Sequence, residues 1–155
     1  MKYGVLDYYG KPEKVEWVPD KIWSIGFEYF VRLTVDAAII DKDRICLVKR
    51  KEEPLKGSWH LPGGFVRKGE SLIEAVKRKA IEETGLEVKV KNPVGVYELY
   101  DPRGHIVTIV WRCRPKAGKL KENARYFGKD DLPNNIGFYH EKLIVDVFNE
   151  SDLLR

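Results

Sequence analysis

The segment from Ser71 to Gly85 constrains the fold most, because it carries signals for both ends of a helix. Ser71 and Glu74 have the spacing of a capping box, in which each side chain accepts a hydrogen bond from the other residue's backbone N–H. Gly85 stands where a left-handed residue ends a helix. Between them, apolar residues recur at helical spacing: Leu72, Ile73, Val76, Ala80 and Ile81. The sequence therefore predicts an amphipathic helix with one face on a core.

Two adjacent carboxylates, Glu82 and Glu83, lie near the C-terminal end of this predicted helix. Acidic groups there face the negative end of the helix dipole, which costs about 0.3–1 kcal/mol each when they are exposed. A divalent cation such as Mg²⁺ offsets this cost, since it prefers oxygen ligands. A solvated helix surface is the alternative interpretation. Arg78 has the spacing to pair with Glu74 and Glu82, each four residues away.

Segments with strand patterning surround the predicted helix. Alternating residues between polar turns predict strands over 30–40, 44–50, 88–100 and 105–114. The stretch 52–64 is rich in glycine and proline and is predicted to be a loop. A second amphipathic helix is predicted within 136–148. Strands mixed with two helices indicate an α/β or α+β fold, in which helices cover a mixed β-sheet.

Length and composition are those of an ordinary globular chain. Its 155 residues suffice for one domain with a core, predicted to span 1–155. The net charge of +4 suits an anionic small molecule as well as nucleic acid, and it decides nothing alone. Two cysteines exclude a disulfide framework. No signal-peptide pattern or long apolar run is present, so we expect a cytoplasmic protein without a membrane partner.

The first 30 residues are rich in aromatic side chains, which are costly to leave in water. These residues are Tyr3, Tyr8, Tyr9, Trp17, Trp23, Phe27, Tyr29 and Phe30. Segment 1–30 is therefore predicted to pack either on the chain's own core or on a second copy of the chain.

The region of the predicted helix resembles the Nudix box, G-x5-E-x7-R-E-U-x-E-E-x-G-U, where U is aliphatic. The matching residues, in register over 23 positions, are Gly64, Glu70, Arg78, Ala80, Glu82, Glu83, Gly85 and Leu86. Leu61-Pro62-Gly63 also resembles the family's usual lead-in. The resemblance covers about residues 30–150 and implies the Nudix fold, a mixed β-sheet sandwiched between helices. Gly63 and Gly85 are expected to have structural roles in it.

One position departs from the Nudix pattern. The family has a glutamate directly after the arginine, and Lys79 stands there in this chain. In the family that glutamate normally helps to bind metal, and in some members it acts as the base. Lys79 is expected to weaken at least one metal site through charge repulsion and loss of a ligand. A lysine here also suits the helix dipole and has the spacing to pair with Glu83.

The resemblance implies a Mg²⁺-dependent pyrophosphohydrolase, with Mn²⁺ as an alternative ion. Glu82, Glu83 and the Gly64 carbonyl would hold the metal. Arg78 would orient those carboxylates, and Glu70 would support the junction between loop and helix. The implied substrate is a nucleoside diphosphate derivative, with ADP-ribose as the first candidate, cleaved to AMP and ribose 5-phosphate. Two alternatives stay open: another nucleotide sugar such as GDP-mannose, and a catalytically weakened Nudix-like protein that binds nucleotides.

Residues outside the box bear on the expected subfamily and on which side chains contact the substrate. The segment 101–105, Asp-Pro-Arg-Gly-His, resembles one common in ADP-ribose pyrophosphatases, although Asp-Pro-x-Gly also forms a plain β-turn. Arg103 in it is expected to present a guanidinium to a phosphate. Glu122 lies in a lysine-rich loop of the kind that often supplies the general base in this subfamily; a solvated loop acid is the other interpretation.

Arg50 and Trp59 are the remaining candidates for substrate contact. Arg50 follows a strand and has the chemistry to meet a diphosphate, with a plain surface role as the alternative. Trp59 has the ring to stack on a base or to pack in the core. A homodimer formed through segment 1–30 is expected, since this is common in ADP-ribose enzymes. No nucleic-acid partner is expected, because the residues after the box are those that the Nudix fold itself uses.

Overall fold

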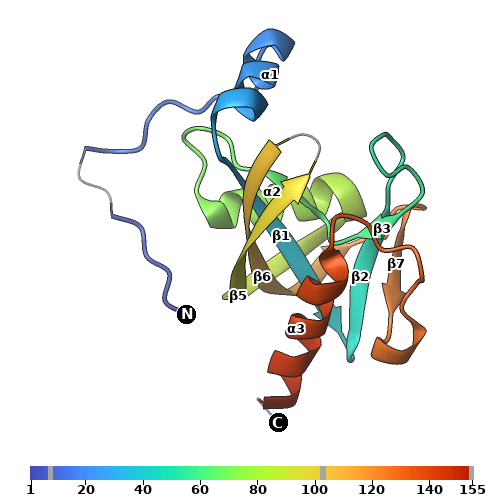
Figure 1. Cartoon of the computed structure of the whole chain (residues 1–155). Coiled ribbons are helices and arrows are strands. Elements are labelled where there is room, and N and C mark those ends of the chain that lie inside the picture. The colour runs from blue at the N-terminus through green and yellow to red at the C-terminus, as the bar shows by residue number, and fades with distance from the viewer. Residues whose placement is uncertain (7–8, 102–103, 154–155) are drawn as a thin grey trace.

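The fold is described from a computed structural model of the chain, in which residues 1–6, 9–101 and 104–153 are described (Figure 1). Within these ranges, seven strands form one sheet in the order β3-β2-β1-β6-β5, with β4 paired to β1 and β7 paired to β2. The strands are β1 (Arg32–Asp41), β2 (Arg44–Lys49), β3 (Trp59–His60), β4 (Gly63–Phe65), β5 (Leu86–Asp101), β6 (Gly104–Gly118) and β7 (Ala124–Phe127). Because β1 and β6 run parallel and β5 and β6 antiparallel, the sheet is mixed, as predicted.

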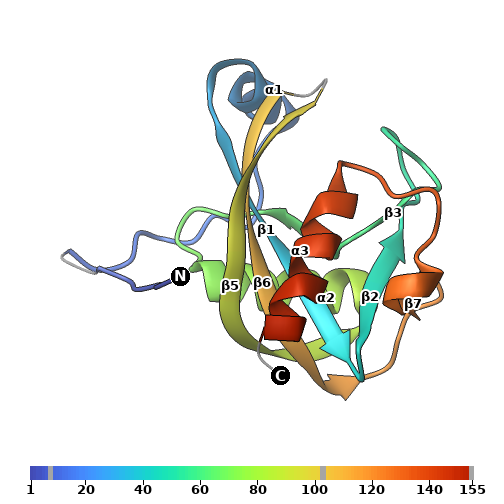
Figure 2. The same ribbon diagram turned by 60° about the horizontal axis from the view of Figure 1, so that its bottom comes forward.

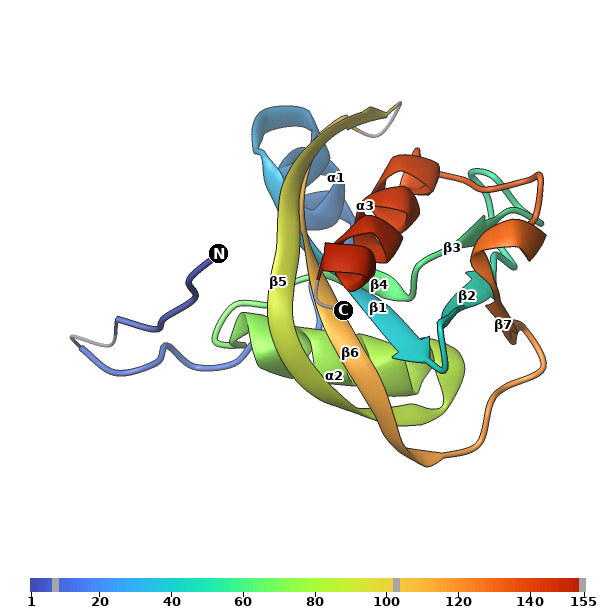
Figure 3. The same cartoon turned by 90° about the horizontal axis from the view of Figure 1, so that it is seen from below.

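Helices cover both faces of this sheet (Figure 3). α2 (Leu72–Thr84) lies on one face and α3 (His140–Leu153) on the other. Successive residues of a strand point to opposite faces, so Ile39 of β1 packs in the core under α2 while Ala38 packs in the core under α3. The predicted sandwich of a mixed sheet between helices is confirmed.

The ends of α2 are those that the sequence predicts. The Ser71 hydroxyl accepts a hydrogen bond from the Glu74 backbone N–H at 3.2 Å, and the Glu74 carboxylate accepts one from the Ser71 N–H at 2.7 Å. Gly85 ends the helix with φ of +79°. A Cβ on Gly85 would lie 2.3 Å from the Lys119 carbonyl oxygen, so the close approach also requires glycine.

Four elements differ from the sequence prediction. The predicted loop 52–64 contains β3 and the start of β4, which are two and three residues long and too short for a patterning signal. α1 (Asp20–Tyr29) was expected only as an aromatic segment. α3 begins at His140 rather than near Ile136, which instead forms a β-bridge with Trp59. A short 3₁₀ helix, η1 (Lys129–Asp131), precedes α3.

β5 and β6 form a long hairpin that curves across the molecule and reaches α1 (Figure 2). Register shifts on either side of Pro93, which has no N–H to donate, interrupt the pairing. At the far end, the backbone of Gly104 approaches α1 so closely that a Cβ there would lie 2.7 Å from the Phe27 carbonyl oxygen. The hairpin and α1 thus extend the molecule beyond the sandwich.

The N-terminal aromatic residues divide between packed and exposed positions. Tyr3 meets the buried ring of Trp111 edge to face at 4.9 Å, and Trp23 of α1 meets Phe65 at the same distance. Tyr9 and Trp17 stay 94% and 73% exposed. The packing of this segment on the chain's own core is therefore only partial.

Helices α1, α2 and α3 and the rest of the described residues include no helix long and apolar enough to span a membrane. The cysteines, Cys46 and Cys113, are free thiols buried in the core under α2, and burial raises the pKa of each to about 12. This agrees with the expectation that the chain has no disulfide framework.

Candidate active site

A cleft of about 730 Å³ runs along the C-terminal half of α2 and the segment that precedes it. Its walls come from α1, α2, the N-terminal segment before α1, the loop after β2 and the strands β1 and β4. Glu82 and Glu83 line one region of the cleft, while Trp23 and Phe27 line another. The cleft therefore joins an ionic surface to an aromatic one.

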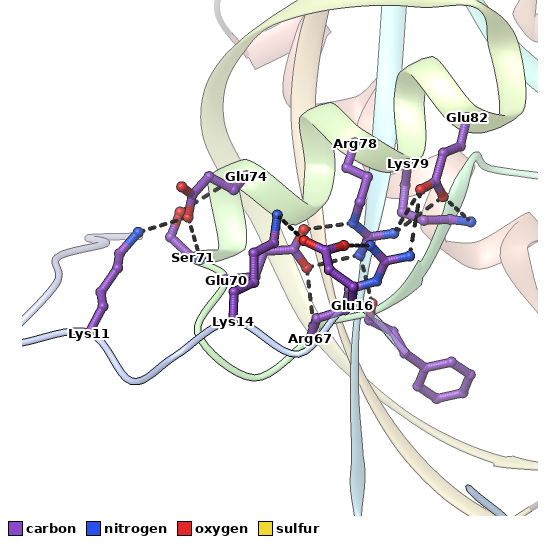
Figure 4. A network of polar contacts seen from close by, with 11 residues as sticks. Lys11, Lys14, Glu16, Arg67, Glu70, Ser71, Glu74, Arg78, Lys79 and Glu82 are labelled. Atoms are coloured by element: carbon purple, nitrogen blue, oxygen red, sulfur yellow. Dashed lines mark hydrogen bonds and ion pairs between the residues drawn. The ribbon is translucent and has the colours of Figure 1, made fainter. Parts of the chain in front are cut away.

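Arg78 is the centre of the ionic surface (Figure 4). Its Nε and Nη2 donate to the two carboxylate oxygens of Glu70 at 2.6 and 2.9 Å, and its Nη1 donates to Glu82 at 3.2 Å. Nη2 also donates to the Phe65 carbonyl oxygen at 3.0 Å. The expected pair with Glu82 is confirmed. The expected pair with Glu74 is wrong, because Glu74 faces Ser71 and Lys11 at the other end of α2.

Glu70 lies buried beneath Arg78, with its side chain only 1% exposed. Burial alone would raise the pKa of this carboxyl, but hydrogen bonds from the Arg78 side chain and the Arg67 backbone outweigh it and hold the pKa below its usual 4.5. The bidentate contact fixes the loop before α2 to the helix itself, because the carboxylate belongs to the loop and the guanidinium to the helix. This geometry suits the supporting role expected of Glu70.

Glu82 and Glu83 are held by nitrogen atoms of the protein. The Lys79 Nζ lies 3.3 Å from a Glu82 oxygen and 2.7 Å from a Glu83 oxygen. The second Glu83 oxygen accepts from the Gly63 backbone N–H at 3.1 Å. The predicted Lys79–Glu83 pair is confirmed. This contact is compatible with both interpretations of Lys79. The ammonium pairs with Glu83 near the C-terminal end of the helix, and it also occupies the position where a metal ion would contact the two carboxylates.

Gly63 and Gly64 bring the backbone of β4 up to these side chains. A Cβ on Gly63 would lie 2.0 Å from Asp36 Oδ1 and 2.6 Å from the Val35 carbonyl oxygen, so only glycine fits. A Cβ on Gly64 would lie 2.8 Å from Cε of Lys79. The lysine stem therefore packs directly on the backbone that was expected to supply a metal ligand.

The donor chemistry of this surface fits a hard divalent cation. Carboxylate oxygens of Glu82 and Glu83 and the Gly64 carbonyl are the ligand types that Mg²⁺ and Mn²⁺ prefer. Among the described residues, no group of three or more His, Cys, Asp or Glu is arranged to hold a metal ion. Because Lys79 contacts both glutamates, an ion at this pair would compete with the ammonium for their oxygens.

The inner end of the cleft holds three residues that the sequence analysis did not select. Asp36, His60 and His140 all line it. Asp36 accepts a hydrogen bond from Thr108 at 2.6 Å, and burial raises its pKa to about 7. His140 Nδ1 accepts from the Leu61 N–H at 3.0 Å, and burial lowers its pKa to about 4. Asp36 had one usable signal, a charged residue inside the otherwise apolar run 35–39.

The aromatic end of the cleft surrounds Arg32. Its guanidinium carbon lies 4.1 Å from the ring centre of Trp23, 4.8 Å from that of Phe27 and 4.7 Å from that of Phe65. The rings meet one another edge to face. Such cation–π contacts, with Arg32 on β1 and the first two rings on α1, attach α1 to the sheet.

The remaining candidates separate in space. Arg50 lines the cleft, where its guanidinium lies 5.0 Å from the ring centre of Phe138 and donates to the Glu53 carbonyl oxygen at 3.2 Å. Trp59 packs edge to face on Phe127 at 4.9 Å and lies outside the residues that line the cleft. Glu122 is exposed in the turn before β7, also outside that lining. Arg103 falls outside the described residues.

The described chain thus places an arginine and two glutamates of one helix along a cleft, next to a mixed sheet that lies between helices. Residues 31–144 match the model of the NUDIX domain family, and the chain belongs to this family. The predicted family and enzyme class are thereby confirmed.

The relatives agree with this assignment. An ADP-ribose pyrophosphatase from Methanocaldococcus jannaschii is 45% identical over 121 residues, which cover 74% of this chain and 71% of that protein. A MutT NUDIX hydrolase structure from Burkholderia pseudomallei has a TM-score of 0.69 at 30% identity, covering 75% of this chain and 97% of the other. An ADP-ribose pyrophosphatase structure from Streptococcus suis has a TM-score of 0.65 at 28% identity, covering 77% and 91%.

Proposed function

We propose that this Nudix hydrolase cleaves a nucleoside diphosphate derivative, with ADP-ribose as its first substrate, to AMP and ribose 5-phosphate. The observation that carries the proposal is the cleft itself, where Glu82 and Glu83 share one cavity with the rings of Trp23 and Phe27. A diphosphate needs the cationic and metal-binding surface, and a nucleoside needs an apolar one. The volume of about 730 Å³ lies in the usual range for small-molecule sites.

The named activity of the Methanocaldococcus jannaschii relative supports ADP-ribose over other substrates. GDP-mannose and related nucleotide sugars remain the alternative within the same reaction class, since they present the same diphosphate. The protein is further proposed to be cytoplasmic and to form its domain from the whole span 1–155.

In the proposed mechanism, Glu82, Glu83 and the Gly64 carbonyl would hold one Mg²⁺ or Mn²⁺ ion. Such an ion would supply charge neutralisation of the diphosphate and a more acidic water molecule. Arg78 keeps Glu82 in place through the 3.2 Å contact while its other nitrogens are fixed on buried Glu70.

Arg50 is proposed to bind the diphosphate from the other wall of the cleft. Its contacts with the Glu53 carbonyl and the Phe138 ring hold the guanidinium in place before the substrate arrives. Arg103 is proposed as a second phosphate contact and Glu122 as the general base, both on the family resemblance. Trp59 is left out of the proposed mechanism, because its ring packs on Phe127 outside the lining of the cleft.

The test is a substrate screen with purified protein and Mg²⁺ or Mn²⁺. ADP-ribose, GDP-mannose, dinucleoside polyphosphates and nucleoside triphosphates are incubated separately, and products are separated by chromatography. We expect AMP and ribose 5-phosphate in equal amounts from ADP-ribose. Glu83→Gln should lower kcat/KM roughly 100-fold, because a neutral amide holds the cation poorly.

Glu87→Gln is the matched control for the Glu83 variant. Glu87 is an exposed residue of β5 that faces Lys116 at 3.8 Å and lies outside the lining of the cleft. Its variant should keep full activity. Release of no product from any of these substrates would contradict the enzymatic proposal. Binding of ADP-ribose in calorimetry without turnover would instead favour the catalytically weakened nucleotide-binding protein, which the Lys79 contacts make the second candidate.

A further inference from the structure

Lys79 is held more firmly than a surface lysine. Its side chain is only 17% exposed, on the wall of the cleft, and its Nζ contacts both Glu82 and Glu83. Its stem packs on Gly64, as the 2.8 Å approach of Cε to the position of a Cβ there requires. Figure 4 shows the Lys79 side chain directed toward Glu82 beside the guanidinium of Arg78. The ammonium is therefore a fixed charge between the two carboxylates.

The nitrogen atoms around these carboxylates satisfy all four of their oxygens. One Glu82 oxygen lies 3.4 Å from Arg78 Nη1 and 3.9 Å from Arg67 Nη2. The other lies 3.2 Å from Arg78 Nη1 and 3.3 Å from Lys79 Nζ. The Glu83 oxygens face Lys79 and the Gly63 N–H. These contacts neutralise the two carboxylates at a helix end that otherwise disfavours acids.

The charges of this cluster balance. Three cations, those of Arg67, Arg78 and Lys79, face three carboxylates, those of Glu70, Glu82 and Glu83. The adjoining Glu16 pairs with both Lys14 and Arg67, and because Lys14 and Glu16 carry opposite charges, they leave the net balance unchanged.

A glutamate at position 79 would remove one positive charge from this cluster and add one negative charge. The local charge would then be two units lower, which is the charge that one divalent cation restores. In net charge, Lys79 is therefore equivalent to a glutamate together with one divalent ion at this place.

We propose that the Lys79 ammonium takes the place of one divalent cation at the Glu82–Glu83 pair. The site consequently takes up one divalent ion fewer than it would with glutamate at position 79, and the ion that it does take up has to displace Lys79 from the carboxylates. The inference deepens the proposed function and rests on it only in treating this pair as the metal-binding end of the cleft.

The test counts Mn²⁺ ions bound per chain, by electron paramagnetic resonance of free Mn²⁺ and by calorimetry, with no substrate present. Lys79→Glu should bind one Mn²⁺ more than the unmodified protein. Lys79→Gln removes the ammonium without adding a carboxylate. It should bind the same number of ions as the unmodified protein, but roughly ten-fold or more tightly, because the cation no longer repels the metal.

Lys77→Glu is the matched control, because it makes the same change in net charge on the same helix at an exposed position outside the cleft lining. It should bind Mn²⁺ as the unmodified protein does. The proposal is overturned if Lys77→Glu tightens binding as much as Lys79→Glu, or if Lys79→Gln leaves both number and affinity unchanged. The measurement on Lys79→Gln tests the proposal even if Lys79→Glu fails to fold. Failure to hydrolyse ADP-ribose would refute the proposed function and leave the ion count standing.

Discussion

At the residue scale, Asp36 and His140 are buried titratable groups with opposite effects on stability. Burial lowers the pKa of His140 from 6.5 to about 4, so between these pH values the unfolded chain binds more protons and stability falls as the pH falls. Burial also lowers the pKa of His60, which acts in the same direction. Burial raises the pKa of Asp36 from 3.8 to about 7, so its native state binds more protons and stability falls as the pH rises.

These opposed contributions make a prediction about pH. In the unmodified protein they offset each other between about pH 4 and 6.5. Asp36→Asn leaves the histidines unopposed, so its free energy of unfolding should fall by about 3 kcal/mol as the pH falls through that range. His140→Asn keeps an acceptor for the Leu61 N–H. Relative to the unmodified protein, its free energy of unfolding should increase as the pH falls through the same range, because the contribution of Asp36 is then less opposed. Urea unfolding at several pH values measures both, and parallel curves for all three proteins would contradict the prediction.

Residue patterns found part of the site and missed the rest. Arg78, Glu82 and Glu83 belong to one helix, where sequence spacing fixes which side chains are neighbours. Asp36 and His140 come from β1 and the start of α3, and only the packing of those elements brings them to the same cleft. No local spacing contains that information.

At the element scale, α2 is a helix that its own sequence specifies. Ser71, Glu74 and Gly85 satisfy its ends within the segment itself, so both termini lie where they are predicted. α1 is different, because its sequence has Gly26 and three aromatic residues and lacks a side-chain cap. Its helix is stabilised by the packing of Trp23 and Phe27 on Phe65 and Arg32, which is a tertiary contact.

The capping box gives a prediction for α2. Ser71→Ala removes the hydroxyl that accepts from the Glu74 N–H and should lower the free energy of unfolding by about 1 kcal/mol. The matched control is Ser24→Ala in α1, whose exposed hydroxyl donates to the Asp20 carbonyl inside the helix and caps nothing. That change should stay within about 0.5 kcal/mol. Urea denaturation measures both, and equal losses for the two variants would argue against a capping role.

At the scale of the whole molecule, an apolar surface lies where α1 meets the start of β1. It consists of side chains that are at least 40% exposed: Ile22, Ile25, Tyr29, Phe30, Val31 and Leu33. Exposed apolar side chains concentrated on two consecutive elements often mark an interaction site. Four of these residues belong to segment 1–30, which was predicted either to pack on the chain's own core or to meet a second copy, so we propose this surface as the homodimer contact.

The dimer prediction is tested by sedimentation equilibrium. The unmodified protein should have the mass of two chains, and Phe30→Lys should shift it toward the monomer, since a lysine is costly to bury in an apolar contact. Val145→Lys changes an exposed residue of α3, on the opposite side of the sheet from α2, and should leave the mass unchanged. A monomeric unmodified protein, or the same shift for both variants, would contradict the proposed contact.

The sequence by itself determined the Nudix family, the mixed sheet between helices and the helix that carries Arg78, Lys79, Glu82 and Glu83. The helix depends on periodicity, caps and spacing within one segment, which are local properties of the chain. The family and its mixed sheet are what the resemblance of that segment to the Nudix box implies. Only the tertiary structure decided that the Lys79 stem packs on Gly64 of β4, that Trp59 packs on Phe127 away from the cleft, and that Asp36 and His140 reach its inner end. Those outcomes depend on how separate elements pack, because residues far apart in the sequence come into contact only where their elements are buried against each other.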